Sequence, residues 1–214
     1  MIKYLPVLLL CCCLAACSSK TDQDAVKGYS ENPTMTRDDS IAMLPLGEQM
    51  AIRKQDALAS GIEVDSIILD HVFGMSRRQV IRHKNKLHRD KRIYPVYKTK
   101  STRAFVYDLN LKSSGRLRTY FDTFYFNDEL YLMECLPKIP KDQTPETIWE
   151  EAIDLFSLKY GDPAFYLPNE TDEAPGGMAI WYQGNLRLEI DYDEDITRIS
   201  YIDMIRENLK LQEI

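Results

Sequence analysis

The stretch Leu186-Arg-Leu-Glu-Ile-Asp-Tyr192 alternates apolar and polar residues along its whole length. A period of two is the pattern of a strand that buries one of its faces. Asp193-Glu194-Asp195 then supplies a turn, and residues 196–205 continue as a second strand, so the sequence predicts an antiparallel hairpin. Because one face of such a sheet is apolar, a helix is expected to cover it, and the expected fold class is α+β.

The covering helix is expected just before this hairpin. Thr144 has the side chain of a helix cap and Pro145 fits the first helical position, whereas Gly161 and Pro163 end the helix. A short strand over residues 178–182 completes the unit. The apolar side of the helix consists of Ile148, Trp149, Ala152, Ile153, Leu155, Phe156 and Tyr160. We expect Ile153 and Phe156 to face Leu188 and Ile190 in the core.

The first half of the chain has the same pattern. Ser76 and Gln79 form a capping box, which predicts a helix from residue 77 to 87 or 88. Strands are expected over residues 103–109, 116–126 and 130–136. The turn in 126–130 matches the turn in 192–196 at the same spacing. The sequence therefore predicts two tandem units, each a helix plus a three-stranded antiparallel meander, at 46–140 and 141–214. A leading helix over 48–60 and a strand over 63–69 precede the first helix. Residues 206–214 are expected either to extend the last strand or to form a short helix.

The N-terminus has the features of an export signal over residues 1–16. Lys3 is followed by an apolar run that is too short to span a membrane. The run ends in Leu14-Ala15-Ala16-Cys17, which resembles the bacterial lipobox. That resemblance implies that Cys17 is lipidated and that two or three acyl chains hold the mature protein to a membrane. The alternative is an ordinary secretory signal that is cut after Ala-x-Ala.

Residues 17–45 have few large apolar side chains and predict a flexible tether. Ser18, at the second position of the lipidated protein, resembles the sorting signal for the outer membrane. Asp22 and Asp24 are similar to signals that export some lipoproteins to the cell surface, and a plain solvated tether explains them equally well. The sequence is therefore compatible with either side of the outer membrane, the periplasmic face or the cell surface.

Composition limits the class of protein further. The hydrophobic content of 44% predicts a packed core, and the net charge of −6 gives no reason to expect nucleic acid as a partner. Once the signal is removed and Cys17 is lipidated, Cys135 is the one remaining cysteine. It lies in an apolar run, so we expect a buried, inert thiol and no intramolecular disulfide.

Two motifs resemble those of the SmpA/OmlA (BamE-like) small outer-membrane lipoproteins. The first is Gly74-Met75-Ser76-x-x-Gln79-Val80, and the second is Phe126-Asn127-x-x-Leu130 in a strand meander. The sequence departs from that family after Leu87, where His88-Arg89-Asp90 replaces Leu-Gly-x-Pro. The resemblance covers residues 73–136 and implies a small α+β architecture at the outer membrane. It carries over no partner-binding residues.

Residues 77–103 are strongly basic in an otherwise acidic chain. Such a segment predicts either a site for anionic lipid, lipopolysaccharide or an acidic partner, or a solvated helix face. We name Arg82, Lys86 and Arg89 as the candidate binding residues. His83 and His88 are five residues apart, not the three or four that would place both on one helical face for a metal.

The acidic residues of the second half form no recognisable catalytic or metal motif. Asp191, Asp193 and Asp195 are similar to the start of a calcium loop, but Ile196 and Ile202 stand where such a loop needs Gly and Glu. We interpret them as strand carboxylates and a hairpin turn. The chain has no nucleophilic triad, phosphate-binding loop or zinc spacing, so we expect no cofactor, no metal and no catalysis.

These features leave three functions open. The first is a membrane-anchored envelope lipoprotein that acts as a non-catalytic binding or scaffold module for another envelope component. The second is an envelope hydrolase that uses the carboxylates of the second half. The third is a binder of anionic lipid or lipopolysaccharide through the basic segment 77–103.

Overall fold

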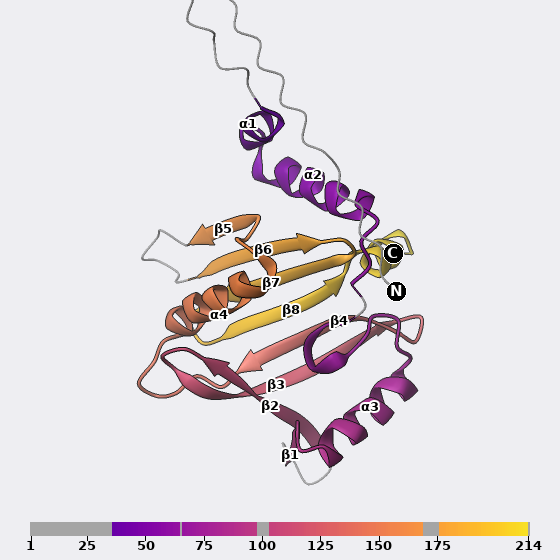
Figure 1. Ribbon diagram of the computed structural model, residues 1–214, viewed down its shortest axis with the longest axis vertical. Helices are drawn as coiled ribbons and strands as arrows, with labels where there is room; N and C mark the ends of the chain where they lie inside the picture. The colour runs from indigo at the N-terminus through magenta and orange to yellow at the C-terminus, as the bar shows by residue number, and fades with distance from the viewer. Residues whose placement is uncertain (1–35, 65, 98–102, 169–175, 214) are drawn as a thin grey trace, which may run out of the picture.

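The strands form one continuous antiparallel sheet. The computed structural model describes residues 36–64, 66–97, 103–168 and 176–213. In this part of the chain, eight strands pair in the order β1-β2-β3-β4-β8-β7-β6-β5 (Figure 1). The strands are β1 Tyr94–Tyr97, β2 Arg103–Leu111, β3 Gly115–Phe126, β4 Glu129–Pro137, β5 Phe165–Pro168, β6 Gly177–Gln183, β7 Leu186–Tyr192 and β8 Thr197–Asp203.

The prediction of two tandem helix-plus-three-strand units is wrong. Strand β4 of the first half pairs with β8 of the second half, with Met133 opposite Tyr201 and Cys135 opposite Ile199. Pairing satisfies two strand edges that separate units would leave open to solvent. A single hydrophobic core then runs through both halves and joins Leu117 and Met133 to residues such as Trp149 and Leu188.

Each half also has one more strand than the sequence predicts. β1 and β5 are short outer strands of four residues each, and both contain proline. Proline is tolerated there because an edge strand has backbone N–H groups that need no partner in the sheet.

The segment after the leading helix is not the strand predicted over 63–69. Residues Ile68–Asp70 form the short 3-10 helix η1, and Leu69 and Asp70 both have positive φ. A hydrogen bond from Ile67 N–H to the His71 carbonyl, 2.8 Å long, closes this turn. The apolar run is therefore used in a tight turn rather than in the sheet.

The described part of the chain has five α-helices. They are α1 Arg37–Ala42, α2 Leu46–Ala59, α3 Arg77–Arg89, α4 Pro145–Tyr160 and α5 Met204–Gln212. The Ser76–Gln79 capping box is confirmed, and so are the Thr144 cap and the proline in the first turn of α4. The tail forms a helix, α5, because the Asp203 side chain accepts hydrogen bonds from the first backbone N–H groups. Helix α1 occupies part of the predicted tether.

Helices α3 and α4 pack on the same face of the sheet. Trp149 of α4 donates a 2.8 Å hydrogen bond to the Ile190 carbonyl, and Phe156 contacts the ring of Tyr201. Lys84 of α3 lies over the ring of Phe121, on the same side of β3. The predicted packing of Ile153 and Phe156 with Leu188 and Ile190 is confirmed, since all four belong to the common core.

Candidate functional site: the open face of the sheet

The face of the sheet opposite α3 and α4 is the candidate site. Along β7, Leu188 and Ile190 point to the core, so Arg187, Glu189 and Asp191 point to this second face. We call it the open face, because α3 and α4 both lie on the other side (Figure 1). Helices α2 and α5 approach it at one end, where Glu207 of α5 binds Arg187. The open face runs across all eight strands and mixes charged, aromatic and aliphatic side chains.

Acidic side chains line up across the middle of the open face. Asp122 of β3 is opposite Glu134 of β4, Glu134 is opposite Ser200 of β8, and Ser200 is opposite Glu189 of β7. Asp122 is exposed and Glu134 is half-buried. Sequence reasoning missed this line, because its members lie on strands that are adjacent only in the folded sheet. The one signal in the sequence was that each of these residues occupies a polar position in a strand of alternating polar and apolar residues.

Two of the second-half carboxylates on which the hydrolase alternative depends have a structural partner. Glu189 lies 2.8 Å from Arg187, and Asp191 lies 3.4 Å from Arg198. Burial raises the pKa of both carboxyl groups above the ordinary range, and the neighbouring arginines oppose that rise. They line a hollow of about 510 Å³ together with Met178.

A smaller hollow of about 260 Å³ lies at the other end of the open face. Its walls include Tyr94, Val106 and Arg118, and Arg116 pairs with Asp108 across its rim. Both hollows are lined by residues of the open face, so this face is not flat.

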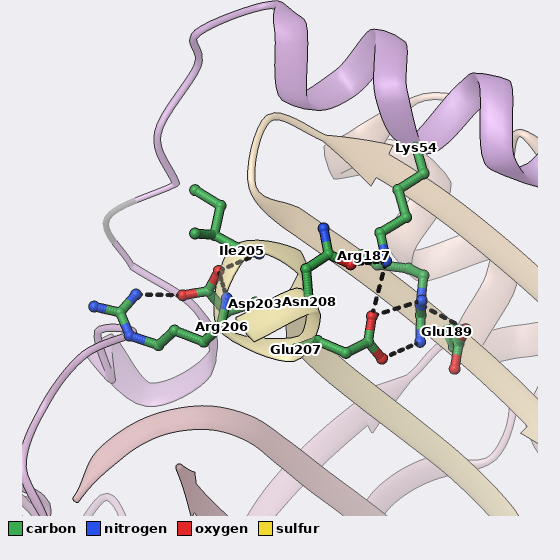
Figure 2. Close-up of polar contacts among 8 residues, drawn as sticks. All are labelled: Lys54, Arg187, Glu189, Asp203, Ile205, Arg206, Glu207 and Asn208. Carbon is green, nitrogen blue, oxygen red and sulfur yellow. Dashed lines mark hydrogen bonds and ion pairs between the residues drawn. The ribbon is translucent and has the colours of Figure 1, made fainter. Parts of the chain in front are cut away.

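One end of the sheet is tied to two helices by a polar cluster (Figure 2). Arg187 of β7 donates two hydrogen bonds to Glu207 of α5, at 3.0 and 2.9 Å. Lys54 of α2 donates to Glu207 at 3.2 Å and to Asn208 at 2.7 Å. This bidentate arginine–carboxylate pair fixes α5, and the lysine holds α2 beside it.

A second polar cluster joins the two motifs that carry the family resemblance. Gly74 N–H donates to the Leu130 carbonyl and Leu130 N–H to the Met75 carbonyl, both at 2.9 Å. Arg206 of α5 pairs with buried Asp203 and with Glu129, and its guanidinium occupies the space that a Cβ at Gly74 would need. With φ at +80°, position 74 favours glycine on two grounds.

The structure divides the basic segment into two groups. Arg77 approaches Asp128, Lys84 donates to Thr123 and Arg92 pairs with Asp70, so these three serve the fold. The candidates Arg82, Lys86 and Arg89 are exposed on one side of α3. In the described residues, none of the three forms an ion pair.

The histidines are structural. His83 contacts the Leu69 carbonyl at 2.7 Å, and His88 contacts the Ile93 carbonyl at 3.3 Å. His71 is fully buried with its ring 4.7 Å from that of His83, and its Nε2 has no partner among the described residues. Burial is the largest influence on His71 and lowers its pKa to about 4.

The remaining predicted sites are Cys17, Cys135 and the acidic residues 191–195. The lipidation residue Cys17 lies outside the described residues. Cys135 is a buried free cysteine as predicted, and burial raises the pKa of its thiol to about 12. Asp193 accepts hydrogen bonds from Asp195 and Ile196 N–H and closes a hairpin turn. Within the described ranges, no group of three or more His, Cys, Asp or Glu residues could hold a metal ion.

In the described ranges, no helix combines the length and apolar character that crossing a bilayer requires. The chain matches no protein-family model, no curated protein and no solved structure. The SmpA/OmlA resemblance and the lipobox therefore stay predictions.

Proposed function

We propose that this chain is an outer-membrane lipoprotein, anchored through Cys17, that acts as a non-catalytic module and binds an envelope protein on the open face. One observation carries the binding role: α3 and α4 both cover the same face, and the opposite face presents the half-buried side chains of Tyr120, Leu132, Glu134 and Leu136. Surfaces of this mixed kind, with aromatic residues among charges, are typical of protein interfaces. The lipobox motif at 14–17 supports the anchor.

Labelled palmitate and Cys17→Ser test the anchor. The natural chain should incorporate the label and sediment with membranes, and the variant should do neither. A single acyl chain binds only marginally, whereas two or three hold a protein effectively permanently. Incorporation of the label by Cys17→Ser would contradict the proposal.

A photo-crosslinking side chain at Phe124 tests the open face in living cells. Phe124 is 38% exposed on that face, and Leu158 is 87% exposed on α4, which packs on the other face. We expect a discrete crosslinked product from position 124 and none from position 158. Equal crosslinking from both positions, or none from either, would contradict a binding role for the open face.

A second function is favoured by the exposed, unpaired side of α3. Arg82, Lys86 and Arg89 would bind phosphate groups of anionic lipid or lipopolysaccharide, at about 1 kcal/mol for each charge near an anionic membrane. Replacing all three by Glu should abolish binding to anionic vesicles. A matched triple reversal at the exposed Lys138, Lys141 and Lys159 should not.

Two conditions make this vesicle test decisive. Both triple variants must carry Cys17→Ser, because acyl chains would bind any vesicle. Binding by the natural side chains should also fade as salt rises from 0.01 to 1 M, since the screening length falls from about 30 to 3 Å. If binding does not depend on salt and is equal in both variants, the exposed side of α3 is a solvated surface and not a binding site.

A further inference from the structure

Two carboxylates on the open face oppose each other without compensation. Asp122 and Glu134 are directly paired across β3 and β4. Among the described residues, neither forms an ion pair or a side-chain hydrogen bond. Like charges directly opposite in a sheet destabilise the pair of strands. The free protein therefore carries a local cost at this position.

The cations of β7 and β8 on the open face are engaged elsewhere. Arg187 is bound by Glu207 and Glu189, and Arg198 is paired with Asp191. Lys84 feels the charge of Asp122, which raises its pKa against the larger lowering by burial. Its ammonium, however, packs over Phe121 on the opposite face and donates to Thr123. Among the described residues, no ion pair joins either carboxylate to a cation on the open face.

Apolar side chains border the acidic pair on both sides. Tyr120 is opposite Leu136 in the preceding row, and Phe124 is opposite Leu132 in the following row. Lys and Arg have long aliphatic stems that pack on such surfaces while their charged heads reach a carboxylate. A carboxylate pair between two apolar rows therefore matches a cationic side chain better than an anionic or a purely apolar one.

We infer that the open face binds a cationic protein segment, whose Arg or Lys head lies between Asp122 and Glu134 while its stem packs on Phe124 and Leu136. This inference rests on the proposed function and specifies the chemistry of its partner. Charge-assisted bonds to two carboxylates would remove the repulsion between them. Relief of this repulsion would then add to the free energy of binding.

Defined peptides test the inference. Three twelve-residue peptides, in which Arg, Ser or Glu alternates with Thr, are titrated into the full-length protein in phosphatidylcholine nanodiscs. Only the Arg peptide should bind. Asp122→Asn with Glu134→Gln should weaken that binding about tenfold or more, as expected when a charge partner is lost. The matched control, Asp142→Asn with Asp154→Asn, removes two exposed carboxylates away from the open face and should change affinity less than twofold.

Thermal melting separates this role from a structural one. Because the two substitutions remove a repulsion, the double variant that carries Asp122→Asn and Glu134→Gln should melt at the same temperature as the natural protein or higher. A lower melting temperature would mean that the carboxylates support the fold, and would overturn the inference. Equal affinity of the Arg and Ser peptides would overturn it as well.

Two further outcomes are distinguishable. If calcium chloride raises the melting temperature of the natural protein but not of the double variant, at matched ionic strength, the pair is a cation site and the inference fails. If the crosslinked product from position 124 persists unchanged in the double variant, the open face binds its partner without this pair. In that case the inference fails while the proposed function stands.

Discussion

Helices α3 and α4 cover the same face of one sheet in different ways. Helix α4 buries Ile148, Trp149, Ala152, Ile153 and Phe156 and contacts strands of both halves. Helix α3 buries only Val80 and Leu87 and leaves a basic side exposed. The two helices follow equivalent patterns in the sequence. In the fold, however, α4 contributes many side chains to the common core, whereas α3 contributes few and packs at the edge of that core. The position in the sheet decides the difference, because α4 lies near the β4–β8 junction.

The largest effect should come from removing a core side chain of α4. Phe156→Ala should lower the free energy of unfolding by about 3–5 kcal/mol, because it empties a buried site against Tyr201. Leu158→Ala, on the same helix but 87% exposed, should change it by less than about 0.5 kcal/mol. Denaturant unfolding measures both.

The same experiment tests whether the core is common. Tryptophan fluorescence reports on the second half through Trp149 and Trp181, and circular dichroism reports on all strands. With one core, both signals should follow a single transition that Phe156→Ala shifts as a whole. Two separate transitions would restore the independent units that the β4–β8 pairing contradicts.

An intermediate effect is expected under α3 and depends on pH. The folded protein holds His71 neutral with a pKa of about 4, whereas the unfolded chain titrates near 6.5. As pH falls from 6.5 to 4, the unfolded state gains a proton that the folded state does not. Stability should therefore drop by about 3 kcal/mol over this range.

His71→Gln isolates this effect from the other titrating groups. The variant should lose most of the drop between pH 6.5 and 4, whereas His88→Gln, on α3 itself, should retain it. Chemical denaturation at several pH values measures the difference. An identical pH profile in the natural protein and in His71→Gln would show that the buried imidazole does not set the acid sensitivity of this half.

The smallest effect should come from a contact that joins the halves. Glu151 of α4 accepts hydrogen bonds from Ser113 and Ser114 N–H in the β2–β3 turn, at 3.0–3.1 Å. Burial alone would raise the pKa of Glu151, but these bonds outweigh it and lower the pKa below its ordinary value of 4.5. Glu151→Gln should cost about 1 kcal/mol.

Acid should remove the same contribution from the natural protein. Because the pKa is lowered in the folded state, the contribution is present above pH 4.5 and disappears as pH falls through the lowered pKa. Glu150→Gln, one position along α4 and exposed, should leave stability unchanged at neutral pH. A loss of stability equal to that of Glu151→Gln would contradict the role of the turn contact.

Local signals in the sequence predicted most elements correctly. The Ser76 and Thr144 caps placed the starts of α3 and α4, and strict alternation placed β7. The short proline-containing strands β1 and β5 escaped, because four residues give too little periodicity. The apolar run at 63–69 misled, because its strand-like composition is also compatible with the tight turn around η1.

The sequence by itself determined the caps, the hairpins and the buried Cys135, because each depends on residues close together in the chain. It also indicated that Arg82, Lys86 and Arg89 share one side of a helix, since helical spacing is local. Only the tertiary structure decided that the halves share one sheet and one core, because the β4–β8 pairing joins residues about 65 positions apart. That same pairing brings Asp122, Glu134 and Glu189 into one line on the open face. Strand register, which no local pattern specifies across such a distance, is the physical reason.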